Sequence, residues 1–64
     1  MTDDEAIDKL GGTNKVAELF DVTPGAVTHW RYDGIPLARR FKFKKALEAG
    51  GITVPVDFVE RAAQ

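Results

Sequence analysis

The 64-residue chain contains no cysteine, which excludes disulfide bonds, zinc sites built on thiolates and cysteine nucleophiles. Its single histidine cannot supply a multi-histidine metal site. No apolar run approaches the roughly 20 residues of a membrane span, and the acidic N-terminus does not resemble a signal peptide. We therefore expect a cytoplasmic protein that uses no metal or cofactor, does not enter a membrane and has no small-molecule substrate.

The length of the chain is that of one small domain. A chain of this size buries only about 60% of its unfolded surface, so its stability should be modest. No two side chains have the spacing of a nucleophile and its base, and there is little room for a catalytic cleft. We expect one domain over residues 1–64, no catalytic residues and no enzymatic activity.

The net charge of −1 conceals a strong segregation of charge along the chain. Residues 1–23 hold six acids and two bases, and residues 48–64 hold three acids and one base. Residues 24–47 hold six bases and a single acid, Asp33. Because a local basic surface attracts polyanions whatever the net charge, this basic middle segment is the expected contact with nucleic acid.

Local signals predict two helices in the acidic N-terminal third. Residues 2–5, Thr-Asp-Asp-Glu, have the form of a capping box, which begins a helix that Gly11-Gly12 ends. Thr13 is expected to cap a second helix over residues 14–20.

Two more helices are predicted in the basic middle segment. Thr23-Pro24 combines a helix cap with proline at the first helical position, and the helix should run to about residue 32. Ile35-Pro36 opens a fourth helix over about residues 37–49. The apolar tail after it could form a strand that turns into a last helical turn.

The third helix has two chemically different faces. At 100° per residue, Val27 and Trp30 fall on one side and form an apolar face. The opposite face carries small, hydroxyl, imidazole and phenol groups at spacing i, i+3, i+4, i+7: Gly25, Thr28, His29 and Tyr32. A stripe of this kind, without acids, suits a helix that lies in the major groove and touches base edges. Two short helices joined by a tight turn, the second with such a stripe, are typical of a helix-turn-helix.

Residues 13–32 resemble the helix-turn-helix signature of the phage Cro repressor family. The apolar and small-residue positions of that signature are occupied by Val16, Ala17, Val22, Val27 and Trp30. The stretch 22–30 followed by Gly34-Ile35-Pro36 is most similar to the helical branch of the family, and the resemblance covers roughly residues 4–52. Asp21 stands at the turn position that is usually glycine, and aspartate tolerates the left-handed backbone needed there.

The resemblance implies an all-α bundle of four to five short helices and a transcriptional repressor. It also implies a homodimer, formed in solution or only on DNA, that binds a pseudo-palindromic operator in double-stranded DNA. In the family, long polar side chains often read bases early in the recognition helix, where this chain has Pro24 and Gly25. Base readout is therefore expected from Thr28, His29 and Tyr32, while Pro24 and Gly25 permit close backbone approach.

The chemistry of each side chain indicates whether it would contact a base or a phosphate. Thr28 is a candidate for a base or thymine-methyl contact, and His29 for donation to a guanine or a phosphate. Tyr32 is expected to contact a phosphate or to act as a partly buried wedge. The other candidates for contact with the DNA backbone are Thr13, Asn14, Lys15, Thr23, Arg31, Arg39 and Arg40.

Three alternatives stay open at this level. Phe41 and Phe43 lie about 200° apart on a helix, so either one of them faces outward or residues 41–44 form a strand. The strand would give an α+β fold with a C-terminal β-hairpin, in which residues 52–58 return. The valines and phenylalanine of the tail are either a dimer surface or core: Val54, Val56, Phe58 and Val59. Functionally, the helix-turn-helix could instead serve as a protein-interaction adaptor.

Overall fold

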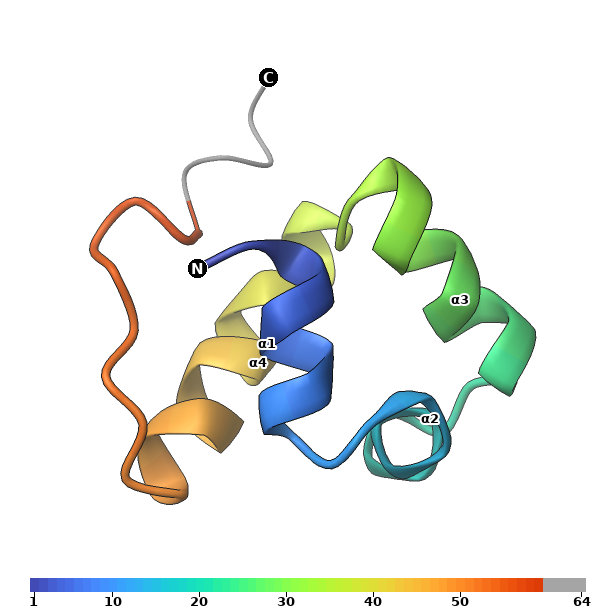
Figure 1. The fold of residues 1–64 in the computed structure, drawn as a ribbon, viewed down its shortest axis with the longest axis horizontal. Coiled ribbons are helices and arrows are strands. Elements are labelled where there is room, and N and C mark those ends of the chain that lie inside the picture. Colours follow the sequence, from blue (N-terminus) through green and yellow to red (C-terminus); the bar gives the residue numbers. More distant parts are fainter. Residues whose placement is uncertain (60–64) are drawn as a thin grey trace.

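A computed structural model of the chain describes residues 1–59. Within that range it has four helices and no strand: α1 (Asp3–Lys9), α2 (Thr13–Phe20), α3 (Pro24–Asp33) and α4 (Leu37–Ala49) (Figure 1). The predicted all-α bundle is confirmed. The β-hairpin alternative is wrong, because residues 41–44 lie inside α4. None of the four helices has the length and apolar character needed to cross a membrane.

The first helix begins where the capping box predicts. The Glu5 amide donates to the Thr2 hydroxyl at 3.1 Å, and the Thr2 amide donates to Glu5 Oε1 at 3.0 Å. Asp3, Asp4 and Glu5 then occupy the first turn, where the helix dipole favours negative charge.

The start of α2 differs from the expectation by one residue. Gly12 is the residue before the helix, with φ 98° and ψ 179°, and Thr13 is the first helical residue. Thr13 therefore does not cap α2. Its hydroxyl accepts a hydrogen bond from Arg31 Nε at 3.1 Å, which ties α2 to α3.

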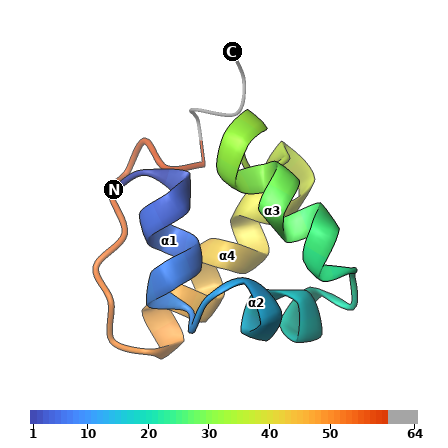
Figure 2. The ribbon, with the colours of Figure 1, turned by 45° about the vertical axis from the view of Figure 1, so that its right-hand side comes forward.

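The turn between α2 and α3 has the geometry of a helix-turn-helix. Asp21 ends α2 in the left-handed region, at φ 55° and ψ 47°. Thr23 caps α3 by accepting from the Ala26 amide at 3.2 Å, and Pro24 takes the first helical position. The two helices cross: α2 is seen nearly end-on in Figure 1 while α3 runs across the view, and Figure 2 shows α3 rising from the turn beside α2.

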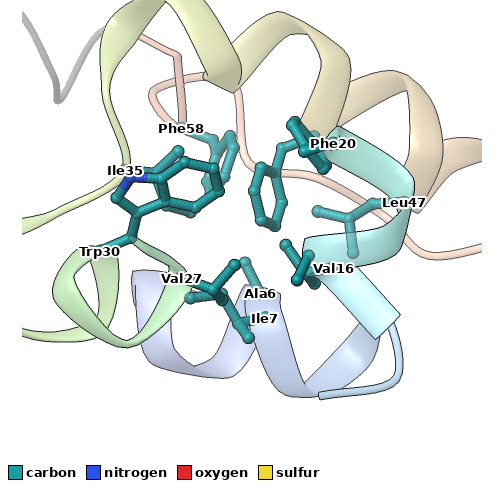
Figure 3. Packing of buried hydrophobic residues seen from close by; sticks show 11 residues of the cluster. Ala6, Ile7, Val16, Phe20, Val27, Trp30, Ile35, Leu47 and Phe58 are labelled. Atoms are coloured by element: carbon teal, nitrogen blue, oxygen red, sulfur yellow. The ribbon is translucent and has the colours of Figure 1, made fainter. Parts of the chain in front are cut away.

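The core is built around aromatic rings from three helices and the C-terminal segment (Figure 3). Phe43 of α4 lies at its centre, with ring centroids 4.7 Å from Phe20, 6.2 Å from Trp30 and 6.5 Å from Phe58. Phe41 is 60% exposed, so the alternative with one ring inward and one outward is the correct one.

Residues 50–59 follow α4 without a helix or strand and return past the start of α1 (Figures 1 and 2). Phe58 is fully buried in the core and Val54 packs against it. Phe58 therefore belongs to the core and cannot be part of a dimer surface, whereas Val56 is 95% exposed.

Candidate nucleic-acid interface

The outer face of α3 carries the polar stripe that the helical spacing predicts. Val27 and Trp30 are buried, while Gly25, Thr28, His29 and Tyr32 are exposed. Tyr32 is 84% exposed, so it is not partly buried as the wedge interpretation requires. The stripe is an accessible surface of about two helical turns.

Thr28 of α3 and Thr23, which caps α3, both use part of their hydrogen-bonding capacity on the backbone of this helix. The Thr28 hydroxyl donates to the Pro24 carbonyl at 3.1 Å, one turn earlier. Its oxygen and its methyl group are left to face a partner, so Thr28 can accept a hydrogen bond or contact a thymine methyl. The Thr23 hydroxyl accepts from the Ala26 amide and keeps its proton for donation, for example to a phosphate.

The acid Asp33 contacts the polar stripe of α3, whose four residues include no acid. His29 Nε2 lies 2.9 Å from Asp33 Oδ2, one turn along α3, and both side chains are mostly exposed. The spacing i, i+4 in the sequence could have indicated this contact, because residues four apart are neighbours on a helix.

Arg31 does not extend toward solvent as expected for a phosphate contact. Its guanidinium binds the carboxylates of Asp4 and Asp8, the latter at 2.8 Å, and donates to the Thr13 hydroxyl. The hydrogen bonds that Arg31 donates to Asp8 and Asp4 raise its pKa above the ordinary value. Arg31 thus fastens α1 to the helix-turn-helix, and its placement corrects the expectation that it faces DNA.

Arg40 departs furthest from the sequence-based expectation. Its side chain is only 4% exposed, and every nitrogen of its guanidinium has a partner. Nε donates to the Ile35 carbonyl at 3.0 Å, Nη1 to the Phe58 carbonyl at 2.8 Å, and Nη2 to Asp3 Oδ2 at 2.6 Å. The guanidinium also lies over the Phe58 ring, 5.0 Å from its centroid. A buried and fully engaged guanidinium cannot reach a phosphate, so the predicted contact of Arg40 with DNA is wrong.

The other bases of the middle segment are closer to the surface. Arg39 is half-buried, with its guanidinium 5.9 Å from the Trp30 ring centroid, beside α3. Lys42 donates to the Leu19 carbonyl at 2.8 Å and lies over the Phe20 ring, so it neutralises the carbonyl end of α2. Lys45 is exposed and Lys44 half-buried on α4. The basic segment therefore offers less positive charge to a partner than its composition indicates.

The start of α2 presents polar groups next to the helix-turn-helix. Asn14 and Lys15 are exposed, and Thr13 is half-buried. These three residues form the first turn of α2, where amides point away from the helix and attract anions.

No group of three or more side chains that could together hold a metal ion occurs among residues 1–59.

Comparison with known families gives one result. The family model described as "DNA-binding transcriptional regulator Cro" matches residues 2–58, nearly the whole chain. No curated protein and no solved structure matches the chain significantly.

Proposed function

The chain belongs to the family of the DNA-binding transcriptional regulator Cro, and from that membership we propose that it is a repressor whose α3 lies in the major groove of an operator. Its family is one of DNA-binding regulators and not of enzymes. Repression would follow from occupancy, because a protein on an operator that overlaps a promoter blocks access of the polymerase.

The observation that carries the proposal is the exposed polar face of α3. Thr28 and His29 lie at its centre and are the proposed contacts with bases, with Pro24 and Gly25 at the end where the backbone can approach closely. Tyr32 is the proposed phosphate contact at the other end.

Polar groups on either side of this face would hold the phosphates. The proposed set comprises the first turn of α2, the cap of α3 and the first turn of α4: Thr13, Asn14, Lys15, Thr23 and Arg39. Thr13 enters this set through its backbone amide, since its hydroxyl already accepts from Arg31. Arg31 and Arg40 are left out because α1 neutralises both of them.

A homodimer is part of the proposal, since one short recognition helix provides few contacts and two copies double them on an inverted repeat. The large apolar side chains on the outer face of α4 are available for a contact between copies. Leu37 and Phe41 lie one turn apart there and are 44% and 60% exposed.

The test is fluorescence anisotropy of labelled duplexes enriched from random DNA, titrated at several salt concentrations. We expect saturable binding, an inverted-repeat site and a steep loss of affinity with salt. Thr28→Ala and His29→Ala should weaken binding at particular base pairs, whereas Thr53→Ala, at an exposed position of the C-terminal segment, should not.

Absence of enrichment together with absence of binding at low salt would contradict the proposal. The second candidate, a helix-turn-helix that serves as a protein adaptor, would then be favoured. Two observations favour the adaptor function: the net charge of −1, and the pairing of Arg31 and Arg40 with acids of α1.

A further inference from the structure

Asp33 occupies a position that is unfavourable for an anion in two respects. It is the last residue of α3, where the helix dipole repels negative charge. Its side chain is also 64% exposed, on the helix that is proposed to approach the negatively charged phosphates of DNA. Burial and packing give no reason for an aspartate there, so its contact with His29 is the interaction to explain.

The contact determines which nitrogen of His29 carries the proton. Nε2 lies 2.9 Å from Asp33 Oδ2, and an ionised carboxylate can only accept hydrogen bonds. In the neutral imidazole the proton must therefore be on Nε2, and Nδ1 is left with its lone pair. Because the His29 side chain is 70% exposed, that lone pair is accessible to a partner.

An imidazole held in this form has a defined preference among bases. In the major groove only adenine N6 and cytosine N4 donate hydrogen bonds, whereas the edge of guanine presents two acceptors, N7 and O6. An acceptor nitrogen on His29 would bind the amino groups and be repelled by guanine. This reverses the expectation from sequence, in which His29 donates to guanine.

We propose that Asp33 is a positioning residue that holds His29 as a hydrogen-bond acceptor and thereby selects adenine or cytosine at the operator position that His29 reads. This inference rests on the proposed function, since it requires α3 to lie in the major groove. Asp33 itself touches no base in this scheme.

The experiment measures the affinity of each variant for duplexes that carry each of the four base pairs at every position of the enriched site. The position that His29 reads is the one whose preference is lost in His29→Ala. At that position the wild type should favour adenine or cytosine over guanine by about tenfold. Asp33→Ala should reduce the preference to within about twofold, because the released imidazole can present either nitrogen.

Asp33→Asn tests whether a partner that can only accept is required. The asparagine amide can accept from Nε2 or donate to it, so this variant should bind all sequences more tightly and should lose much of the preference, as Asp33→Ala does. In the His29→Ala background, Asp33→Ala should leave every base preference unchanged. Thermal unfolding of each variant checks that α3 remains folded.

Three outcomes would overturn the inference while the proposed function stands: a wild-type preference for guanine at the His29 position, a preference that survives Asp33→Ala, or a preference that is undiminished in Asp33→Asn. Failure of the wild type to bind any duplex selectively would instead contradict the proposed function and this inference together.

Discussion

Arg40 Nη2 lies 2.6 Å from Asp3 Oδ2, and this contact joins residues that are 37 positions apart. The same guanidinium binds the carbonyls of Ile35 and Phe58. One side chain of α4 therefore connects α1, the turn between α3 and α4, and the C-terminal segment. The basic run of α4 thus contains a residue whose charge serves the fold.

Removal of Arg40 should destabilise the protein severely. Arg40→Ala removes the guanidinium that pairs with the Asp3 carboxylate in a largely buried site, and breaking a buried ion pair from one side costs about 3–5 kcal/mol. A small domain has a total stability near the low end of about 5–15 kcal/mol, so most of it would be lost. Urea unfolding followed by circular dichroism measures the effect.

Arg39→Ala, one position earlier and half-buried, is the matched control and should change the free energy of unfolding far less. Equal stability of the two variants would refute the structural role of Arg40. Charge reversal at Arg40 is for the same reason a poor test of DNA binding, because an unfolded variant also fails to bind.

The two phenylalanines of α4 should respond oppositely to truncation. Phe43 contacts three aromatic rings at the centre of the core, so Phe43→Ala should lower the free energy of unfolding by about 3–5 kcal/mol. Phe41→Ala removes a largely exposed ring and should change it by less than about 0.5 kcal/mol. Chemical denaturation of dilute samples checks this, and a larger loss in Phe41→Ala would contradict the orientation of α4.

These residues show which parts of the structure could be predicted from sequence. Helix starts depend on neighbours within four residues, so the capping box at Thr2 and the Thr23-Pro24 start were predicted correctly. The inward direction of Phe43 could not be predicted, because it depends on rings that come from distant segments. Helical spacing alone left Phe41 and Phe43 equivalent.

In the candidate site, too, the local features could be predicted from the sequence and the long-range contacts could not. The exposed face of α3 follows from its own periodicity. The partners of Arg31 and Arg40 lie 23 to 37 residues away in α1, and nothing in a run of bases distinguishes a buried arginine from an exposed one. Acids and bases that segregate along the sequence can pair in space, which is how α1 removes two charges from the basic segment.

Asp21 should be the site of a stabilising substitution. Its backbone is left-handed, a conformation that costs about 1–2 kcal/mol for most residues with a Cβ atom and less for aspartate. Asp21→Gly should therefore raise the free energy of unfolding by about 0.5 kcal/mol, and Asp21→Ala should lower it by about 1 kcal/mol. Thermal unfolding of the wild type and of both variants shows whether stability increases from the alanine variant through the wild type to the glycine variant. A glycine variant no more stable than the alanine variant would contradict the turn geometry.

The salt dependence of DNA binding should identify the phosphate contacts. If Lys15 and Arg39 each neutralise one phosphate per subunit, a homodimer has a slope of about −4 in log K against log salt. Lys15→Gln or Arg39→Gln should each reduce its magnitude by about 2 and weaken binding to all sequences alike. Lys9→Gln removes one positive charge from an exposed position of α1 and should leave the slope unchanged. A uniform decrease in all three variants would show a general charge effect instead of defined contacts.

Acid should weaken the start of α1 through Glu5. Hydrogen bonds from the backbone and the side chain of Thr2 lower the pKa of Glu5 below its ordinary value of 4.5. Because the pKa of Glu5 is lower in the folded than in the unfolded state, ionised Glu5 stabilises the fold. This stabilisation is complete at a pH above the pKa of the unfolded state, and it is lost as the pH falls toward the pKa of the folded state. Glu5→Gln keeps an acceptor for the Thr2 amide but cannot titrate.

The difference in stability between wild type and Glu5→Gln should thus be largest near about pH 7 and shrink toward about pH 3. The titration of groups that both proteins share cancels from this difference. Glu48→Gln, an exposed glutamate near the end of α4, provides the matched control and should show no such narrowing. The midpoints of urea unfolding, measured across this pH range, test the prediction. A stability difference between wild type and Glu5→Gln that stays constant with pH would mean that the charge of Glu5 does not support the cap.

Because α1 also supplies the carboxylates that bind Arg31 and Arg40, acid that loosens the first turn of α1 should loosen both of these contacts as well.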